Sequence, residues 1–297
     1  MKHAILGAGA IGGLIGTALS SLGEDVTVVV RAEKLASYPA SLVLERPSDA
    51  ITAPAKAVAT LTKPVDVLWI ATKTYQLQSA IETVKSPPRY VIPLLNGVDH
   101  IAVLRNRFGH EHVIPATIAV EAEQISLGRF IQRSPVVRLN LAASAEPLLG
   151  AIVAQLGKLG FVCKFIPSEQ TLLWGKLCFL GPFALITSAS GMNIGEILAD
   201  ADWNPKLGSA IAEACAVANA SGAKIDAAQI QAGFKSSPPG MRSSMQKDLV
   251  AGRRLELDAI AGPIVRGGEQ YGIAVSTTTE LMSAIQAEVQ AKVQLKD

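Results

Sequence analysis

The stretch "HAILGAGAIGGLIGTALSSLGEDVTVVVR", residues 3–31, decides the fold of the amino-terminal half. Its pattern predicts a short buried strand over residues 3–6, a glycine-rich turn, a helix that ends at Gly23, and a second strand over residues 26–30. The β-branched run "VTVVV" is typical of a strand that is buried on both faces of a parallel sheet. The stretch therefore predicts an α/β domain that begins with a strand, a helix and a parallel strand.

The turn after the first strand carries the motif G-x-G-x-x-G over six residues: Gly7, Ala8, Gly9, Ala10, Ile11 and Gly12. In this motif the first glycine permits a tight turn, the second lets the backbone approach a pyrophosphate, and the third lets helix and strand pack closely. The amino terminus of the helix offers free N–H groups and a positive dipole end to the phosphates. Because the motif follows a strand and opens a helix, it predicts a Rossmann-type dinucleotide-binding domain. The alternative is that the glycines serve close packing alone.

The residue at the end of the second strand indicates which dinucleotide binds. An NAD-specific site has an acidic residue there, which accepts hydrogen bonds from the ribose 2′-OH, whereas an arginine accommodates a 2′-phosphate. This chain has Arg31, and a guanidinium matches phosphate geometry with two hydrogen bonds. We therefore predict NADP(H) as the cofactor. The alternative is that Arg31 is a solvated loop residue and Lys34 makes the contact.

Strands and helices continue to alternate through the first half of the chain. The patterns predict strands over 65–72, 90–98 and 113–120, and helices over 73–84 and 99–108. Ligands of open parallel sheets bind beyond the carboxyl ends of the strands. Lys73, Gln76 and Asn96 follow two of these strands and are predicted to face the same crevice as the glycine turn, although Asn96–Gly97 can also be an ordinary turn pair. Residues 121–142 alternate around a turn and predict an antiparallel hairpin at the sheet edge.

The hydrophobic period becomes helical from about residue 168 and stays so to the end of the chain. Ser168 is a candidate N-cap for a long helix, and further helices are predicted over 204–222, 244–252, 256–272 and 279–293. The fold class is therefore α/β, with an amino-terminal Rossmann-type domain over 1–166 and an all-helical domain over 167–297. The boundary follows from the change of period.

One charged residue, Lys176, interrupts the apolar run "LLWGKLCFLGPFALI" at residues 172–186. Lysine is rarely buried unless it is paired, and a charge removed from water must find a partner or shift its pKa. Either Lys176 extends its ammonium to the surface, or it faces a cavity where the ammonium has a task. The residues alone leave both possibilities open.

Composition excludes several classes of protein. The 297 residues are 49% hydrophobic and 18% charged, which excludes a disordered chain, and the net charge of +2 with scattered basic residues gives no footprint for nucleic acid. Three cysteines, none in a C-x-x-C pair, indicate reduced thiols. The absence of a signal peptide pattern and of an apolar run of about 20 residues predicts a cytoplasmic protein outside the membrane. His110 and His112 lack a third ligand nearby, so no metal site is predicted.

Taken together, the motifs resemble those of the ketopantoate reductases, or 2-dehydropantoate 2-reductases. The glycine motif, Arg31, "KTYQ" (73–76), "NG" (96–97), "WGK" (174–176), "SSMQKDL" (243–249) and "LELDAIAG" (255–262) follow the family's order over essentially the whole chain. The resemblance implies an NADPH-binding domain and a helical domain for substrate binding and dimerisation. It also implies reduction of a small-molecule 2-keto acid to the 2-hydroxy acid, a step of pantothenate biosynthesis if the substrate is ketopantoate. The protein is expected to be a monomer or a homodimer.

The resemblance also implies roles for the matching residues. The lysine matching Lys176 is the general acid, the acid matching Glu256 helps to hold the substrate, and the residues matching Asn96 and Ser244 also contact the substrate. As a hydride reaches the keto carbon, the Lys176 ammonium would stabilise the charge on the carbonyl oxygen and donate its proton. Apolar neighbours such as Trp174 would lower its pKa, and Glu256 would oppose that shift. The expected cofactor-binding residues are Gly7, Ala8, Gly9, Ala10, Ile11, Gly12, Arg31, Lys73, Gln76 and Asn96.

One departure concerns the substrate. Members of the family usually carry asparagines four and eight residues after the catalytic lysine, where this chain has Leu180 and Ala184, and Gly181–Pro182 is expected to kink the helix. The departure predicts a larger or more apolar 2-keto acid, since a site that loses its polar partner loses selectivity for a hydroxyl.

Two other functions stay open. One is a non-catalytic NADP(H)-binding sensor, against which the presence of both Lys176 and Glu256 argues. The other is a related NADP-dependent dehydrogenase, of the 3-hydroxy-acid or opine type, which would lack the pair "SSMQKDL" and "LELDA".

Overall fold

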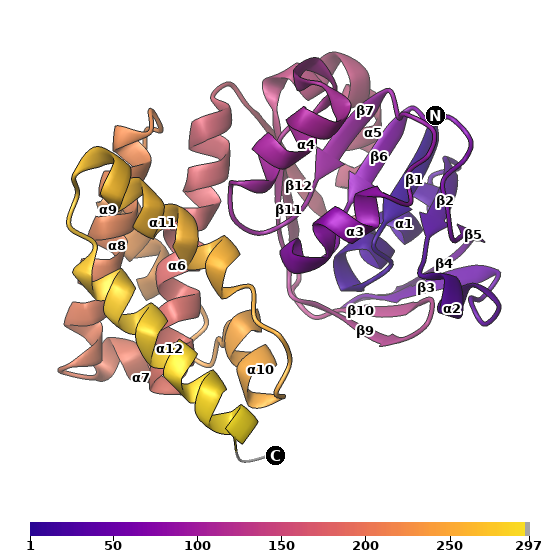
Figure 1. Cartoon of the computed structure of the whole chain (residues 1–297). Helices are drawn as coiled ribbons and strands as arrows, with labels where there is room; N and C mark the ends of the chain where they lie inside the picture. The colour runs from indigo at the N-terminus through magenta and orange to yellow at the C-terminus, as the bar shows by residue number, and fades with distance from the viewer. Residues whose placement is uncertain (295–297) are drawn as a thin grey trace. The chain divides into compact units, whose positions relative to one another are not determined.

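The computed structural model describes residues 1–294, apart from the side chain of Val293, and divides into two compact units (Figure 1). The first unit contains residues 1–95 and 100–172. The second contains Asn96–Asp99 and the residues from Leu173 onward. The first unit contains two clusters of buried hydrophobic side chains, and the second unit contains one.

The first unit contains the parallel sheet that the opening stretch predicts. Its order is β5-β2-β1-β6-β7, and every neighbouring pair is parallel. The strands are β1 (Lys2–Leu6), β2 (Asp25–Val29), β5 (Lys56–Val58), β6 (Val67–Ile70) and β7 (Tyr90–Pro93), and α1 (Ala10–Ser21) follows β1. Because the chain first adds strands on one side of β1 and then on the other, the loop after β1 lies where the strand order reverses. That point is where ligands bind in such sheets.

The predicted hairpin forms, but it belongs to another sheet. β9 (Ala122–Ser126) and β10 (Arg129–Gln132) are antiparallel, and they join β3 (Ser41–Glu45) and β4 (Ala50–Pro54) in the order β4-β3-β10-β9. Its placement at the edge of the parallel sheet was therefore wrong. The reason is a buried face that three fully buried side chains, Leu42, Leu44 and Phe130, share. Phe130 lies where a side chain on Gly13 of α1 would otherwise stand, since a Cβ there would be 2.1 Å from its ring.

The rest of the first unit corrects two further predictions. The strand expected at 113–120 is β8 (Ala116–Ala119), which leaves the parallel sheet and runs antiparallel to β11 (Val137–Ala142) in the order β12-β11-β8. The single helix expected over 73–84 is a short 3₁₀ turn, η1 (Thr74–Gln76), followed by α3 (Leu77–Ile81). The remaining elements of this unit are α2 (Ala32–Leu35), α4 (His100–Phe108), η2 (His110–His112), η3 (Ala143–Ala145), α5 (Glu146–Lys158) and β12 (Phe161–Ile166).

The second unit is all-helical, as the change of period predicts. α6 spans the boundary of the two units, and Ser168 caps it, because its hydroxyl accepts a hydrogen bond from the Thr171 backbone N–H at 3.1 Å. α7 and α9 were not predicted. The helices are α6 (Glu169–Ser190), α7 (Ile194–Ala199), α8 (Trp203–Ala220), α9 (Ala227–Lys235), α10 (Ser244–Val250), α11 (Leu257–Tyr271) and α12 (Ser276–Gln294).

α6 contributes buried apolar side chains to the second unit's core. The helix continues unbroken through Pro182, and Cys178, Leu185 and Ile186 are fully buried. Among residues 1–294 it is the one helix whose length and composition would suit a membrane span, but 72% of its most apolar window is buried inside the protein. Its apolar character is therefore explained by packing.

Candidate active site

Three glycines of the β1–α1 loop differ in what surrounds them. Gly7 has a φ of 100°, and a Cβ there would lie 2.8 Å from the backbone nitrogen of Thr72. A Cβ on Gly12 would lie 2.0 Å from the Gly7 carbonyl oxygen. Gly9, in contrast, has no described atom within 4 Å of an added Cβ. Two of the glycines are therefore required for packing, and the middle one faces open space that a phosphate group can enter.

The first turn of α1 adds hydrogen-bond donors to this loop. Gly9 is the N-cap residue, and among the described residues no side chain caps the helix and no acidic residue stands in its first turn. Gln124 of β9 donates its amide to the Ala8 carbonyl at 3.1 Å and holds the loop from outside, a contact that the sequence did not predict. The exposed first-turn donors and the open side of Gly9 fit the pyrophosphate of a dinucleotide.

Three predicted cofactor residues lie at the same edge of the parallel sheet. Arg31 follows β2, its side chain is 74% exposed, and its Nε lies 3.4 Å from a carboxylate oxygen of Glu33. Lys73 precedes η1 and is half-buried, and Gln76 ends η1 and is exposed. Because β1, β2 and β6 are parallel neighbours, their carboxyl ends meet at one edge, and the loops that carry these residues meet there too.

The second unit contains a chain of hydrogen bonds among three predicted site residues. Lys176 of α6 donates from Nζ to Oδ1 of Asn96 at 2.9 Å. Asn96 donates from Nδ2 to Oε2 of Glu256 at 3.1 Å. Glu256 is the N-cap residue of α11 and is only 6% exposed. We call these three side chains the Lys176–Asn96–Glu256 triad.

The environment of the triad shifts the proton affinity of its lysine. Burial lowers the pKa of Lys176 from its ordinary 10.5 to about 8, and the negative charge of Glu256 opposes this shift. Trp174 and Leu177, its neighbours on α6, are buried in the core of the unit. A lysine with a pKa this close to neutrality is charged at physiological pH and gives up its proton more readily than a surface lysine.

Comparison with known proteins gives the family. Residues 3–145 match the model described as ketopantoate reductase PanE/ApbA, and residues 170–290 match the model of its C-terminal part. Over 298 aligned residues the chain is 30% identical to the 2-dehydropantoate 2-reductase of Caulobacter vibrioides, covering 96% of this chain and 98% of that protein. The chain belongs to the ketopantoate reductase family. It is therefore an oxidoreductase of the ketopantoate reductase type, and its cofactor is a nicotinamide dinucleotide.

Solved structures show the same fold. A ketopantoate reductase from Ralstonia eutropha superposes with a TM-score of 0.86 at 24% identity, covering 98% of this chain and 99% of that one. A D-mandelate dehydrogenase in a ternary structure with NADH and anilino(oxo)acetate has the same TM-score at 22% identity, and the same coverage of both chains. The α/β architecture with a helical second domain is thereby confirmed.

Leu180 and Ala184, the positions at which the resemblance implies asparagine, differ in their accessibility. Leu180 lies one helical turn after Lys176 and is half-buried. Ala184 lies a further turn on and has no exposed surface, because it packs into the core of the helical unit. Leu180 is therefore the better candidate for a residue that touches a ligand.

The structure does not connect Ser244 to the triad. Ser244 is the exposed first residue of α10, and none of the hydrogen bonds identified among the described residues links it to Lys176, Asn96 or Glu256. Its neighbour Ser243 is the buried N-cap, which accepts from the Gln246 backbone N–H at 3.1 Å and shares a hydrogen bond with Thr187 of α6 at 2.7 Å.

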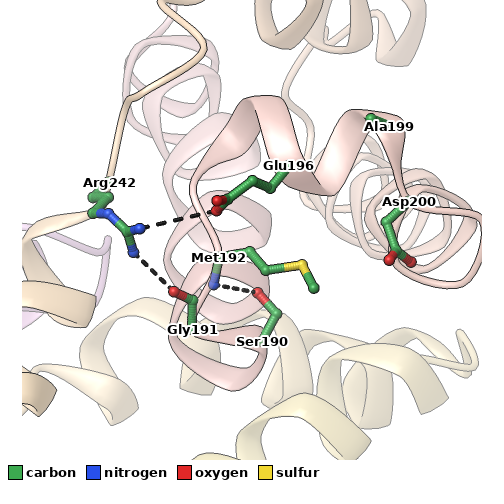
Figure 2. A pocket seen from close by; sticks show the side chains of 7 residues that line it. All are labelled: Ser190, Gly191, Met192, Glu196, Ala199, Asp200 and Arg242. Carbon is green, nitrogen blue, oxygen red and sulfur yellow. Dashed lines mark hydrogen bonds and ion pairs between the residues drawn. The ribbon is translucent and has the colours of Figure 1, made fainter.

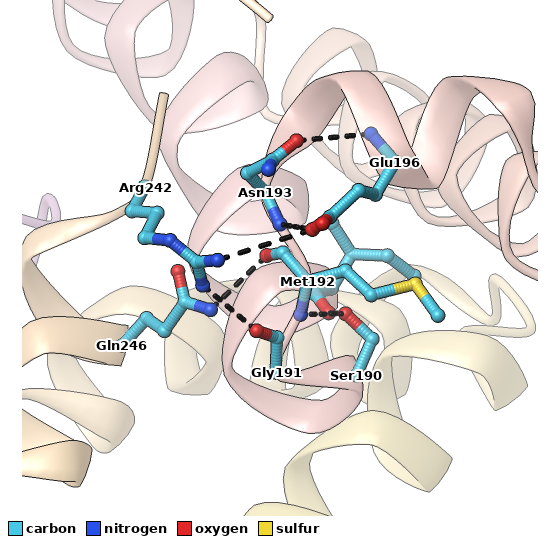
Figure 3. Close-up of polar contacts among 8 residues, drawn as sticks. Ser190, Gly191, Met192, Asn193, Glu196, Arg242 and Gln246 are labelled. Atoms are coloured by element: carbon cyan, nitrogen blue, oxygen red, sulfur yellow. Dashed lines mark hydrogen bonds and ion pairs between the residues drawn. The ribbon is translucent and has the colours of Figure 1, made fainter. Parts of the chain in front are cut away.

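A hollow of about 530 Å³ in the helical unit contains none of the predicted site residues (Figure 2). It is lined by Ser190, Gly191, Met192, Glu196, Ala199, Asp200 and Arg242. Figure 3 shows that polar groups around it bond to the turn between α6 and α7: Arg242 donates to the Gly191 carbonyl at 2.8 Å, and Gln246 to the Met192 carbonyl at 3.0 Å. These contacts hold the turn between α6 and α7.

Within residues 1–294 no group of three or more His, Cys, Asp and Glu side chains is placed to hold a metal ion. His112 has its Nδ1 2.9 Å from the Arg89 carbonyl oxygen, in an exposed position.

Proposed function

We propose that the protein is an NADPH-dependent reductase of a 2-keto acid, 2-dehydropantoate or a close analogue, which it converts to the 2-hydroxy acid. The observation that carries the proposal is the Lys176–Asn96–Glu256 triad, in which a desolvated lysine donates a hydrogen bond at 2.9 Å and has a pKa of about 8. Membership of the ketopantoate reductase family supports the same reaction.

The cofactor residues are those at the edge of the parallel sheet. The nicotinamide dinucleotide, when bound, supplies a hydride to the keto carbon. The glycine loop over residues 7–12 and the first turn of α1 would hold the pyrophosphate, and Arg31 would pair with the 2′-phosphate. Lys73, Gln76 and Asn96 make further polar contacts with the cofactor.

The triad supplies the proton and stabilises charge. As negative charge develops on the carbonyl oxygen, the Lys176 ammonium stabilises it and then transfers its proton to that oxygen, leaving a neutral amine that solvent reprotonates. Asn96 orients the ammonium through the 2.9 Å hydrogen bond, and Glu256 keeps it charged before the reaction. Glu256, Asn96 and Ser244 hold the substrate.

We assign residues 1–166 to NADP(H) binding and residues 167–297 to substrate binding and dimerisation. A ketopantoate reductase of Staphylococcus aureus with the same fold is described as dimeric, which supports a homodimer over a monomer. We place the protein in the cytoplasm, with no nucleic-acid or membrane partner. If the substrate is ketopantoate, the reaction belongs to pantothenate biosynthesis.

A second candidate substrate class is an apolar or aromatic 2-keto acid. Leu180 presents an apolar, half-buried side chain one turn from Lys176. The D-mandelate dehydrogenase with the same fold was crystallised with anilino(oxo)acetate, a carboxylate that carries an aromatic ring. These two observations favour a substrate pocket less polar than one that recognises a hydroxyl group.

The test is a panel of 2-keto acids, among them ketopantoate, 2-ketoisovalerate and phenylglyoxylate, each with NADPH and with NADH. We expect loss of NADPH absorbance with at least one of them and a slower rate with NADH. The Lys176→Ala variant gives the background rate. Tight NADPH binding without oxidation by any keto acid would instead support a cofactor sensor.

A further inference from the structure

The residue at the centre of the triad lies on a short connecting segment. Asn96 begins the segment Asn96–Asp99, which we call the strap; it is grouped with the helical unit, whereas the residues on both sides of it are not. A four-residue segment has no hydrogen-bonded secondary structure of its own to hold it. The position of Asn96 therefore depends on what the strap touches.

The first half of the strap contacts α11 at two points. Asn96 donates to Glu256, the N-cap of that helix, at 3.1 Å. Gly97, with a φ of 79°, lies so close to α11 that a Cβ would be 2.2 Å from the Ala259 carbonyl oxygen. That carbonyl receives no helical N–H from four residues on, because residue 263 is proline. The strap backbone therefore packs onto a carbonyl that the helix leaves without its usual donor.

The end of the strap is held by a third contact. Arg266 donates from one guanidinium nitrogen to Oδ2 of Asp99 at 2.5 Å, and from the other to Oδ1 of Asp258 at 2.8 Å. Asp258 and Arg266 are both on α11, two turns apart. The arginine thus folds back along its own helix to reach the strap.

Gly262 leaves room for the Arg266 side chain to lie along α11. A Cβ at that position would lie 2.5 Å and 2.6 Å from the two terminal guanidinium nitrogens of Arg266, and 2.6 Å from Oδ1 of Asp258. The guanidinium and the carboxylate meet over the missing side chain. Glycine in a helix interior lowers helix stability relative to alanine, so its presence midway between Asp258 and Arg266 needs a reason, and the ion pair supplies one.

We propose that Arg266 is a positioning residue for the proposed reaction: laid over Gly262, it clamps Asp99 and the strap to α11 and so sets the place of the Asn96 amide between Lys176 and Glu256. This inference rests on the proposed function. Arg266 touches neither Lys176 nor Glu256 in the contacts described above, and it acts through Asn96.

The clamp contributes to position more than to stability. The side chains of Asp99, Asp258 and Arg266 are 55%, 77% and 50% exposed, and exposed ion pairs add little to the free energy of folding. Loss of the clamp should therefore change turnover while the melting temperature stays the same. A merely structural role would change both.

The first experiment compares Asp99→Asn and Gly262→Ala with wild type, using the best substrate of the keto-acid panel and NADPH. We expect kcat to fall roughly two- to fivefold in each, the range that an exposed charge network supports, with KM for NADPH unchanged. Gly262→Ala should keep or raise the melting temperature while it displaces the guanidinium. Asp25→Asn is the matched control, since it makes the same chemical change at an exposed aspartate that pairs with Lys56 in the first unit, and it should retain wild-type kcat. An equal loss in Asp25→Asn, or wild-type kcat in both test variants, would overturn the clamp.

The second experiment asks whether the clamp acts through Asn96. Asp99→Asn should lower kcat in the wild-type background and have no further effect in the Asn96→Ala background, because residues that act through one contact are not additive. Arg266→Lys should retain more activity than Arg266→Gln. Additive losses would contradict the positioning role. If Asn96→Ala alone leaves turnover unchanged, the proposed function fails; if it lowers turnover while Asp99→Asn and Gly262→Ala do not, only the clamp fails.

Discussion

The glycine loop and the triad differ in how the sequence builds them: the loop is formed by backbone atoms of adjacent residues, and the triad by side chains that are far apart in the sequence. The loop is six consecutive residues whose backbone is proposed to bind the cofactor, and Gly9 leaves room for a phosphate because no described atom lies within 4 Å of where its Cβ would be. The triad joins side chains that are 80 and 160 positions apart, and its lysine owes its pKa of about 8 to what surrounds it. A site made from backbone is local, whereas a site made from side chains depends on tertiary packing.

The largest effect is expected where the triad loses its charge. Lys176→Ala should lower kcat by about a hundredfold to ten-thousandfold, because a proton donor and a charge stabiliser are lost together. The Kd for NADPH should change little, since the proposed phosphate contacts lie on the other unit. Lys206→Ala, an exposed lysine paired with Glu280, is the control and should keep full activity. Near-wild-type turnover in a folded Lys176→Ala protein would contradict the proposed catalytic role of the triad.

Arg31 tests whether the sheet edge recognises a 2′-phosphate. Arg31→Ala should weaken NADPH binding by about 2 kcal/mol, roughly thirtyfold, through loss of a charge-assisted hydrogen bond. NADH binding should stay the same, because NADH has no 2′-phosphate. Titration of both cofactors into both proteins measures the effect, with Arg129→Ala, an exposed arginine of the same unit that pairs with Glu45, as the control. Equal affinity of the intact protein for NADPH and NADH would contradict the cofactor assignment.

A pair of glycine variants separates binding from folding within the loop. Gly9→Ala should fold with an unchanged melting temperature and bind cofactor roughly tenfold more weakly, since the new methyl group meets the phosphate and not the protein. Gly12→Ala should lower the free energy of unfolding by about 1–3 kcal/mol, because its Cβ would stand 2.0 Å from the Gly7 carbonyl oxygen. If Gly9→Ala destabilises the fold and leaves the cofactor Kd unchanged, the loop is a packing device alone.

Leu180 tests the polarity of the substrate pocket on the triad side. Leu180→Asn should raise the ratio of kcat/KM for ketopantoate over an apolar 2-keto acid by roughly fivefold, the value of one hydrogen bond of about 1 kcal/mol. Ala184→Asn serves as the contrast: it would bury an amide in the core and should lower the melting temperature instead. A wild-type protein that already prefers ketopantoate, and loses that preference with Leu180→Asn, would show that another residue recognises the hydroxyl.

The pH dependence of reduction tests whether the surroundings of the triad set the pKa of Lys176. Lys176 is protonated below its pKa, so kcat should decline as the pH rises through about 8. The charge of Glu256 raises that pKa, and Glu256→Gln should therefore move the alkaline limb to lower pH. Asp258→Asn, on the exposed side of α11, should leave the limb in place. A limb that moves to higher pH in Glu256→Gln would mean that another group titrates.

Local signals predicted many of the elements correctly. β1, α1 and β2 were predicted because their apolar period and their glycines act over a few residues, and the cap at Ser168 was predicted for the same reason. The helices expected at 204–222 and 256–272 are α8 and α11, each followed by a glycine in the left-handed region, Gly222 and Gly272. The unpredicted α7 also carried a local signal, because Asn193 and Glu196 form a capping box at its start.

Non-local pairing was not predictable in the same way. The alternation over 121–142 showed that a hairpin forms, but its partner strand β3 is some 85 residues earlier, so the sheet that it joins depends on long-range contacts. The strand at 116–119 likewise pairs antiparallel with β11 and not with the parallel sheet. The apolar period of a segment predicts which of its faces is buried, but it does not predict which other element packs against that face.

By itself, the sequence determined the dinucleotide loop, the helical second half and the family, because these depend on backbone conformation and on motifs that a few adjacent residues carry. Only the tertiary structure decided where the Lys176 ammonium lies and what it contacts. The apolar run around it was consistent with an ammonium at the surface, and the folded chain instead places that ammonium 2.9 Å from Asn96, with Glu256 beyond it. The pKa of a side chain is a property of its neighbours in space, and the chain brings those neighbours together only when it folds.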